Sequence, residues 1–265
     1  MSLAGVRHVI VVSSGKGGVG KSTVTVNLAV CLARSGKKVG ILDADVYGPD
    51  IPIMFGVSKP PTIENNRIQP PVEHGVKLMS LGFLVDPEQA VIWRGPMVMQ
   101  ALDQMMNQVD WGDLDFLLVD MPPGTGDAQL TMTQKVPLAG AILVSTPQAV
   151  ALADTIKGLA MFRKVSTPIL GMVENMSQFL CPHCGGATDF FRSGTVREAC
   201  RHYEVPYLGQ IPFDPAAREG GDRGVPITVS QPGSPVGQAF RGVADLILAA
   251  MPEPTGPIPI VRRAE

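Results

Sequence analysis

Five short runs of Val, Ile and Leu place the tightest constraint on how this chain can fold, because none of them alternates with polar residues. A continuous apolar run is typical of a strand buried on both faces, as in a parallel sheet between two helical layers. The runs predict strands at residues 8–12, 39–42, 116–119, 141–144 and 169–173. Amphipathic stretches predict helices at residues 21–35, 96–109, 148–165, 194–203 and 235–250. This alternation indicates an α/β fold with a doubly wound, mostly parallel sheet.

The remaining segments indicate how the 265 residues are organised. Residues 47–91 are rich in Pro and polar groups, which predicts loops with short strands. The final stretch, "PEPTGPIPIVRRAE", holds too much proline for a helix. We therefore expect a single domain over residues 1–250, with a cysteine-containing insertion near residues 177–192, and an extended tail over residues 251–265.

The net charge, the apolar runs and the cysteines limit the partners and the cellular compartment that we expect for this chain. A formal net charge of −2 gives no electrostatic reason to expect nucleic acid as the main partner. No apolar run approaches the ~20 residues that a helix needs to cross a bilayer, so no membrane partner is expected. Four irregularly spaced cysteines do not indicate a disulfide framework, which favours a reducing cytoplasm.

A glycine-rich stretch, "GKGGVGKS", follows the first predicted strand and precedes the first predicted helix. This context matches the phosphate-binding P-loop, whose backbone N–H groups point at phosphates. In such a loop Lys21 would reach the β- and γ-phosphates, and Ser22 would offer its hydroxyl to Mg²⁺. The nucleotide-binding residues expected here are Gly15, Lys16, Gly17, Gly18, Val19, Gly20, Lys21, Ser22 and Thr23.

Lys16 is a second lysine, one residue after the first glycine of the loop. In this it resembles the deviant Walker A loop of the ParA/MinD class of P-loop NTPases, which includes the iron protein of nitrogenase. The resemblance implies that Lys16 crosses a dimer interface to the partner's nucleotide, where a cation stabilises charge that develops during phosphoryl transfer. A solvated loop lysine is the alternative. The resemblance therefore implies a nucleotide-dependent homodimer.

Carboxylates stand at the ends of two predicted strands. Asp43 and Asp45, in "ILDAD", could both point at the carboxyl edge of the sheet, where ligands bind in such folds. By resemblance we assign Asp45 to the attacking water and Asp43 to a supporting catalytic role. Asp120, in "LLVDMPPGTGD", has the Walker B position for holding Mg²⁺, and Gly124 lies in a turn that could sense the γ-phosphate. A strand-end carboxylate can also be a helix cap or a turn former.

Two later residues are candidates for recognising the base. Asn175, in "GMVENM", follows a predicted strand at a place where relatives in that class use the side-chain amide to read adenine. A turn-forming Asn is the alternative. Pro212, in "IPFDP", is expected in the other wall of the base pocket. ATP is favoured over GTP because no Asn-Lys-x-Asp guanine motif occurs.

Cys181 and Cys184, in "FLCPHCGG", have the spacing of a metal-binding knuckle. One pair supplies only two thiolates, whereas a tetrahedral or cluster site usually requires four. Cys31 and Cys200 fall at helical spacing with apolar residues and are expected in the core, while His183 is expected to be exposed. A two-fold axis beside the knuckle would bring two pairs together, so a homodimer would complete the site.

The residues themselves leave the chemistry of the cysteine pair open. Four thiolates suit Zn²⁺ as well as a [4Fe–4S] cluster. A redox couple and an inert turn are further alternatives.

Seven segments carry a resemblance to the Mrp/ApbC group of iron–sulfur cluster carrier ATPases, over residues 9–237. They are "SSGKGGVGKST", "LDADVYGPDIPIMFG", "RGPMVMQAL", "VDMPPGTGDAQLT", "STPQAVALADTIKG", "ENMSQFLCPHCGG" and "IPFDPAAREGGDRGVPI". The resemblance implies ATP hydrolysis at the P-loop, a cluster shared at Cys181 and Cys184 between two subunits, and delivery of that cluster to apoproteins. The alternative is a ParA/MinD-like positioning or partner-switch ATPase with a structural zinc bridged between subunits.

Overall fold

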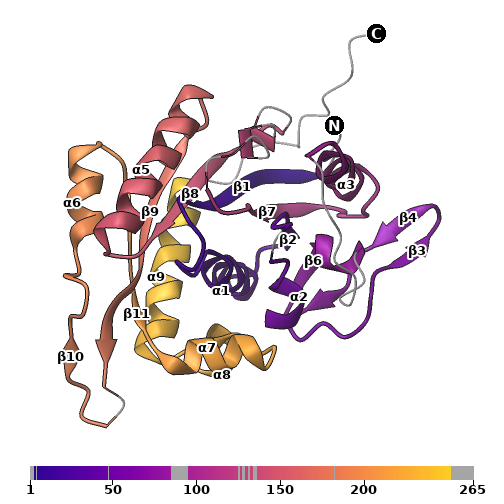
Figure 1. Cartoon of the computed structure of the whole chain (residues 1–265). Coiled ribbons are helices and arrows are strands. Elements are labelled where there is room, and N and C mark those ends of the chain that lie inside the picture. Colours follow the sequence, from indigo (N-terminus) through magenta and orange to yellow (C-terminus); the bar gives the residue numbers. More distant parts are fainter. Residues whose placement is uncertain are drawn as a thin grey trace.

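The computed structural model describes residues 3, 5–46, 48–84, 95–124, 126, 129–130, 132–133, 136–181 and 183–251. Its described elements form a central sheet with helices on both faces (Figure 1). The strands of this sheet are β1 (Val6–Ser14), β2 (Val39–Asp43), β5 (Val72–Glu73), β6 (Val76–Ser80), β7 (Leu114–Asp120), β8 (Gly140–Ser145), β9 (Ile169–Leu180), β10 (Ala187–Thr188) and β11 (Tyr207–Phe213). The helices are α1 (Lys21–Arg34), α2 (Ile51–Met54), α3 (Gly95–Asn107), α5 (Ala149–Lys164), α6 (Thr195–His202), α7 (Pro215–Asp222), α8 (Ile227–Ser230) and α9 (Pro235–Ala250), with a 3₁₀ turn at η1 (Leu81–Leu84).

The strand order of the main sheet is β10-β9-β8-β1-β7-β2-β6-β5, and β11 also pairs with β9. Every pair between β9 and β6 is parallel, as is the pair of β11 with β9. Among the described strands of this sheet, only the short strands β5 and β10 pair in the antiparallel sense. A separate hairpin is formed by β3 (Thr62–Glu64) and β4 (Arg67–Gln69). The doubly wound, mostly parallel sheet predicted from the apolar runs is confirmed.

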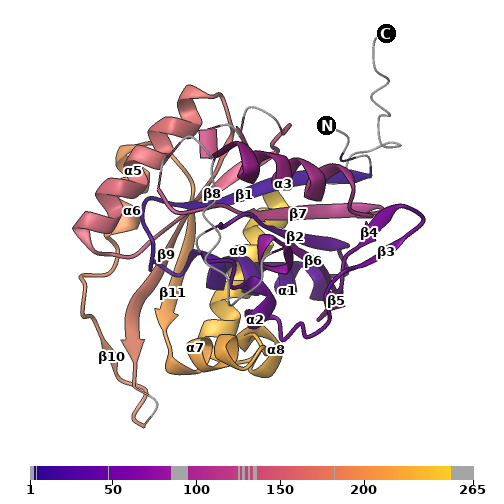
Figure 2. The same cartoon turned by 45° about the vertical axis from the view of Figure 1, so that its right-hand side comes forward.

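Two hydrophobic cores, one on each face of the sheet, explain why the strand sequences do not alternate. In β1, Ile10 and Val12 pack in the core that holds α1 and α9, whereas Val9 and Val11 pack in the core that holds α3 and α5. Successive side chains of a strand point to opposite faces, so both faces must be apolar when both are covered. Figure 2 shows α3 and α5 on one side of the sheet and α1 and α9 on the other.

All five predicted strands and all five predicted helices are present among the described residues. Their ends are shifted by at most two positions, except that β9 runs seven residues beyond its predicted end. Short strands were expected within residues 47–91, where β3 to β6 lie, but the expectation did not place β6 in the main sheet, and β10, β11 and helices α2, α7 and α8 were not predicted. In β6, Lys77 breaks the apolar run, and its amine bonds the carbonyl oxygens of Asp110 and Trp111. In β11, Gly209 and Pro212 weaken the strand pattern. The tail expected at residues 251–265 lies outside the described residues, apart from residue 251.

The cysteine pair lies on a projecting segment, here called the cysteine arm (residues 175–191). Strand β9 pairs with β8 as far as Glu174 and continues into the arm, where it pairs with β11 and β10. At Met176 the backbone φ is 53°, and between the pairs Asn175–Ile211 and Phe179–Phe213 strand β9 advances four residues while β11 advances two. Such a bulge bends a strand. Figures 1 and 2 show the arm, labelled β10, extending away from the helices.

No helix in the described ranges is both long enough and apolar enough to cross a membrane.

Candidate nucleotide site and cysteine pair

The glycine-rich loop joins β1 to α1 and has the backbone freedom and space that a phosphate cradle needs. Gly18 and Gly20 have φ values of 80° and 81°, in the left-handed region that glycine adopts at little cost. Gly15 lies so close to the backbone of Asp154 and Thr155 on α5 that no Cβ would fit there. Helix α1 has no side-chain cap, so its first N–H groups face the loop without a side-chain acceptor.

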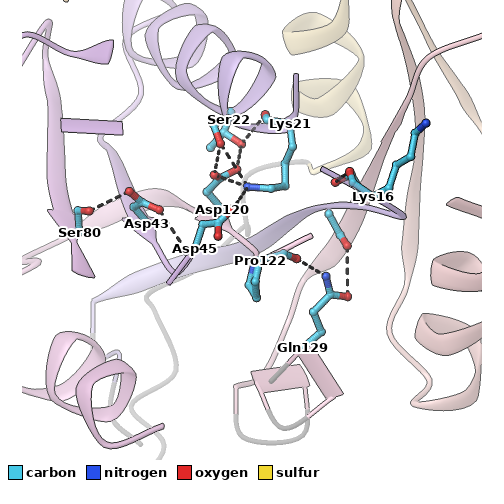
Figure 3. Close-up of polar contacts among 12 residues, drawn as sticks. Lys16, Lys21, Ser22, Asp43, Asp45, Ser80, Asp120, Pro122 and Gln129 are labelled. Atoms are coloured by element: carbon cyan, nitrogen blue, oxygen red, sulfur yellow. Dashed lines mark hydrogen bonds and ion pairs between the residues drawn. The ribbon is translucent and has the colours of Figure 1, made fainter. Parts of the chain in front are cut away.

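A buried polar cluster lies directly beneath this loop (Figure 3). The Lys21 Nζ atom is 2.5 Å from Asp120 Oδ2 and 3.4 Å from Asp45 Oδ2. Ser22 donates a hydrogen bond of 2.7 Å to Asp120 Oδ2, and Thr25 donates one of 2.6 Å to Asp120 Oδ1. The lysine, hydroxyl and strand-end carboxylates predicted from three separate segments therefore meet at the carboxyl edge of the sheet.

Electrostatics keep Lys21 in its charged form. Burial alone would lower the pKa of Lys21, but the neighbouring carboxylate of Asp120, with further contributions from Asp45 and Asp43, raises that pKa above its ordinary value. A lysine held as a cation at the start of α1 is suited to pair with phosphate oxygens.

Asp43 and Asp45 have different surroundings although only one residue separates them. The Asp43 carboxylate is fully buried, accepts a 2.8 Å hydrogen bond from Ser80, and accepts the backbone N–H of Asp45 at 3.2 Å. Burial, followed by the charge of Asp120, raises the pKa of Asp43 to about 8. Asp45 instead faces Lys21. The geometry thus makes Asp43 a support for the turn that presents Asp45.

Lys16 and Gly124 lie at the rim of the same loop. In Figure 3 the Lys16 side chain points away from Lys21 and Asp120, and its carbonyl oxygen accepts a 3.0 Å hydrogen bond from the hydroxyl of Ser14. Gly124 has a φ of 97°, and its N–H donates to the carbonyl oxygen of Ser14 at 3.0 Å. The turn after β7 is therefore fixed to the end of β1, next to the loop.

A cavity of about 490 Å³ opens beside the loop, where the expected base-recognition residues lie together. The Asn175 amide donates a 2.9 Å hydrogen bond to the carbonyl oxygen of Val19, which ties β9 to the glycine-rich loop. The residues that line the cavity are Thr23, Asp50, Ile53, Met54, Asn175, Met176, Ile211, Pro212, Phe213, Asp214, Ala217, Arg218, Gly221, Asp222 and Phe240. Apolar residues form most of this lining and polar or charged residues form the rest, a combination that suits a small-molecule pocket.

Sequence reasoning missed three polar residues that shape the site. Thr25 follows Lys21 by one helical turn, so its contact with Asp120 could have been inferred from helical spacing. Ser80 ends β6, a strand that the apolar pattern did not reveal. Gln129 donates to the carbonyl oxygen of Pro122, and its own carbonyl oxygen lies 3.5 Å from the hydroxyl of Ser13. Both Ser80 and Gln129 meet the site only through tertiary contacts.

The knuckle that carries Cys181 and Cys184 is formed at the tip of the cysteine arm. The Cys181 N–H donates to the carbonyl oxygen of Gly186, and the Gly185 N–H donates to that of Cys181, both at 2.9 Å. Cys181 is half-buried and Cys184 is exposed. The backbone N–H groups of Cys184 and His183 lower the pKa of the Cys181 thiol. The tip therefore carries two cysteines that solvent can reach, and it favours a thiolate at Cys181.

The other two cysteines are core residues, as predicted. Cys31 and Cys200 are both buried, and burial raises the pKa of each thiol to about 11. His183 is exposed, also as predicted. Within the described part of the chain, no group of three or more His, Cys, Asp or Glu side chains is arranged to hold a metal ion. The described residues therefore offer the knuckle two sulfur ligands and no third.

The parallel sheet, the glycine-rich loop and the Lys21–Asp120 cluster define a P-loop NTPase. More particularly, the chain belongs to the ParA family, and the matching family description, NUBPL iron-transfer P-loop NTPase, covers residues 5–248. The resemblance to iron–sulfur cluster carrier ATPases inferred from the sequence is thereby confirmed.

Similar curated proteins carry names that refer to iron–sulfur chemistry. An iron-sulfur protein required for NADH dehydrogenase, mitochondrial, from Arabidopsis thaliana is 51% identical over 96% of this chain and 82% of its own length. The iron-sulfur cluster carrier protein of Synechocystis is 51% identical, over 93% of this chain and 71% of its own. The iron-sulfur cluster transfer protein NUBPL of Mus musculus is 49% identical, over 93% and 78%.

Similar solved structures include nucleotide complexes. A nucleotide-binding protein from Archaeoglobus fulgidus in complex with ADP, a structure in which cobalt was found, is 42% identical with a TM-score of 0.74, over 83% of this chain and 87% of that one. The septum site-determining protein MinD of Pyrococcus horikoshii, complexed with Mg-ADP, is 28% identical with a TM-score of 0.67, over 92% and 97%.

Proposed function

We propose that this chain is an ATP-hydrolysing carrier that binds an iron–sulfur cluster between two subunits and transfers it to apoproteins. One observation carries the proposal: strand β9 contributes Asn175 to the nucleotide cavity and leads into a knuckle that carries Cys181 and Cys184 at the surface, with no third ligand among the described residues. The names of the relatives support the same function.

The residues beneath the loop fit magnesium and nucleotide. Ser22 and Asp120 offer hard oxygen ligands that already lie within hydrogen-bond distance of each other, which is the donor set that Mg²⁺ takes with a nucleotide. A bound magnesium ion would neutralise charge on the β- and γ-phosphates. Lys21 would hold the same phosphates through its amine, and Gly15, Gly17, Gly18, Val19, Gly20 and Thr23 would supply backbone N–H groups.

The remaining catalytic roles follow from position. Asp45 would orient the attacking water, since its carboxylate faces Lys21, and Asp43 would hold the turn through the Asp45 N–H. Gly124, fixed beside the loop, would contact the γ-phosphate. Lys16 would reach the nucleotide of the partner, because its side chain points away from its own Lys21–Asp120 cluster. We assign base recognition to Asn175 and Pro212, with ATP as the nucleotide.

The cargo site would be completed by symmetry. Two knuckles facing each other across a two-fold axis supply four thiolates, which suits a [4Fe–4S] cluster. Zinc takes the same ligands and is the competing occupant. The free cysteines suit a reducing compartment, and we propose the cytoplasm. Clients would be apoproteins that require a cluster, and neither nucleic acid nor a membrane is part of the proposed function.

Anaerobic reconstitution with iron and sulfide tests the proposal. The expected product is a brown dimer that holds about one cluster and passes it to an apoprotein with a [4Fe–4S] site. Cys181→Ala should abolish the colour, while Cys200→Ala, the same substitution at a buried core position, should retain it. A colourless wild-type product, or freshly prepared protein that holds only zinc under anaerobic conditions, would contradict the carrier function.

A further inference from the structure

Four phenylalanines, three of them exposed, form a cluster on and beside the cysteine arm, here called the aromatic patch (Phe179, Phe190, Phe191 and Phe213). Phe190 is 62% exposed, Phe191 43% and Phe213 41%. Ring centroids lie 6.0 Å apart for Phe179–Phe190, 6.3 Å for Phe179–Phe213 and 6.4 Å for Phe190–Phe191. Together with Met176 and Gln178, the patch lines a cavity of about 200 Å³. Contiguous exposed apolar surface of this kind marks an interaction site.

Along the cysteine arm, residues of the aromatic patch lie both before and after the two cysteines. Phe179 precedes Cys181 by two residues and pairs across the arm with Thr188, which itself precedes Phe190 by two. A partner that contacts these two cysteines is therefore also placed close to the aromatic rings.

The charges on the arm indicate what kind of partner this is. Residues 175–188 contain no Asp, Glu, Lys or Arg. The next carboxylate, Asp189, accepts hydrogen bonds from the backbone N–H groups of Phe191 and Ser193. In a two-fold interface each surface meets its own copy, so charges close to the axis would face like charges. An aromatic arm whose residues 175–188 carry no charged side chain, and which supplies half a ligand set, matches a second copy of itself.

We propose that the aromatic patch is the surface on which a second copy of this chain packs, so that the two arms cover the shared metal centre. The inference rests on the proposed function and adds the surface that closes the site. Apolar side chains around a metal centre limit access of solvent to it. The eight rings of two patches would therefore protect the cargo as well as join the subunits.

The nucleotide cavity shares two side chains with this interface. Met176 and Phe213 line both the cavity beside the glycine-rich loop and the cavity beneath the aromatic patch. Met176 also lies in the bulge of β9, where its backbone φ is positive. A nucleotide base that packs on one side of these two side chains changes the space available on the other side. Packing of the second copy would therefore depend on the nucleotide, which links dimer closure to ATP.

The test compares the full-length wild-type chain, Phe190→Ser/Phe191→Ser, and the control Ile63→Ser after anaerobic reconstitution with iron and sulfide in the presence of ATP. Ile63 is 76% exposed on β3, away from the arm. Sedimentation velocity should show the dimer of the double variant weakened at least about tenfold. Its cluster absorbance should also decay faster when a chelator is added. The Ile63 variant should match wild type in both measurements.

Three results would contradict either this inference or the proposed function. A double variant that dimerises and keeps its cluster like wild type overturns the inference. So does one that dimerises normally but no longer passes the cluster to an apoprotein, because the patch then serves a client. A wild-type chain that takes up no iron and sulfide contradicts the proposed function alone, and the dimer affinities of the zinc-loaded chains then decide the inference.

A second variant covers the case in which the serine substitutions prevent folding. Phe190→Trp keeps the apolar bulk of the patch and adds a fluorescent reporter. Its emission, after subtraction of the wild-type spectrum, should shift to shorter wavelength as the dimer forms. An emission that does not change between monomer and dimer would overturn the inference.

Discussion

The Lys21 amine lies 2.5 Å from the Asp120 carboxylate, and both side chains are buried. A buried ion pair stabilises a fold only when its remaining hydrogen-bonding capacity is satisfied. Here Ser22 and Thr25 supply hydroxyl donors to the two Asp120 oxygens. One carboxylate therefore organises the amine and hydroxyls that the proposed chemistry requires.

Asp120→Asn should remove both the proposed magnesium ligand and the charge partner of Lys21. We expect the rate of ATP hydrolysis to fall by about 100-fold or more. The free energy of unfolding should fall by about 3 kcal/mol, since Lys21 is left buried without its closest anion. Phosphate release and urea unfolding measure the two effects.

The matched control is Asp115→Asn, the same substitution on the same strand β7. Its carboxylate pairs with Arg7 at 2.9 Å near the surface, where such pairs contribute less than about 1 kcal/mol. Equal rates of ATP hydrolysis in the two variants would contradict the role given to Asp120.

Gly15→Ala and Gly17→Ala test how tightly the glycine-rich loop packs at two positions. A Cβ at Gly15 would overlap the backbone of Asp154 and Thr155, whereas at Gly17 the nearest atom, Pro123 Cγ, is 4.0 Å away. Gly15→Ala should therefore lower the free energy of unfolding by about 2–4 kcal/mol, and Gly17→Ala should change it by less than about 1 kcal/mol. Urea denaturation measures the free energy of unfolding of both variants. Equal values for the two variants would contradict the close packing of α5 against the loop.

Asn175→Ala should weaken recognition of the base. The substitution removes the 2.9 Å hydrogen bond to the Val19 carbonyl oxygen and a polar group of the nucleotide cavity. Affinity for ATP should fall about tenfold and the preference for ATP over GTP should narrow. Competition of both nucleotides against a fluorescent ATP analogue measures the change. Gln178→Ala, three residues further along β9 and outside the nucleotide cavity, should bind like wild type. An unchanged ratio of the two affinities would remove Asn175 from base recognition.

The four thiols should divide into two classes when alkylated at increasing pH. The thiolate is the reactive form, so a lowered pKa brings reactivity to lower pH. Cys181, whose pKa lies below its ordinary value of 9.0, should react first, together with exposed Cys184. Cys31 and Cys200 have pKa values of about 11 and are buried, so they should remain unmodified up to about pH 9 until the chain is unfolded. Mass spectrometry of iodoacetamide-treated metal-free protein would detect this. Early modification of Cys200 would contradict the packing of α6.

The sequence could predict features that depend on consecutive residues or on the ends of recognisable strands. The apolar runs identified the central strands because burial on both faces leaves a local pattern, and the P-loop residues are consecutive. Asp45 and Asp120 could be placed together since parallel strands end at a common edge. Ser80 could not be placed, because the Lys77-interrupted strand that carries it gives too weak a pattern. The aromatic patch was also missed: Phe179 and Phe213 are distant in sequence, and only the pairing of β9 with β11 brings them together.

The side chains of Met176 and Phe213 line both the cavity beside the glycine-rich loop and the phenylalanine-lined one. Consider a small molecule that competes with ATP but places a larger group than adenine against Met176 and Phe213. On the proposed scheme this molecule would change how tightly the protein holds its metal cargo, although it would not contact a sulfur atom. Inhibitor design directed at the base pocket would then also give chemical control over metal delivery.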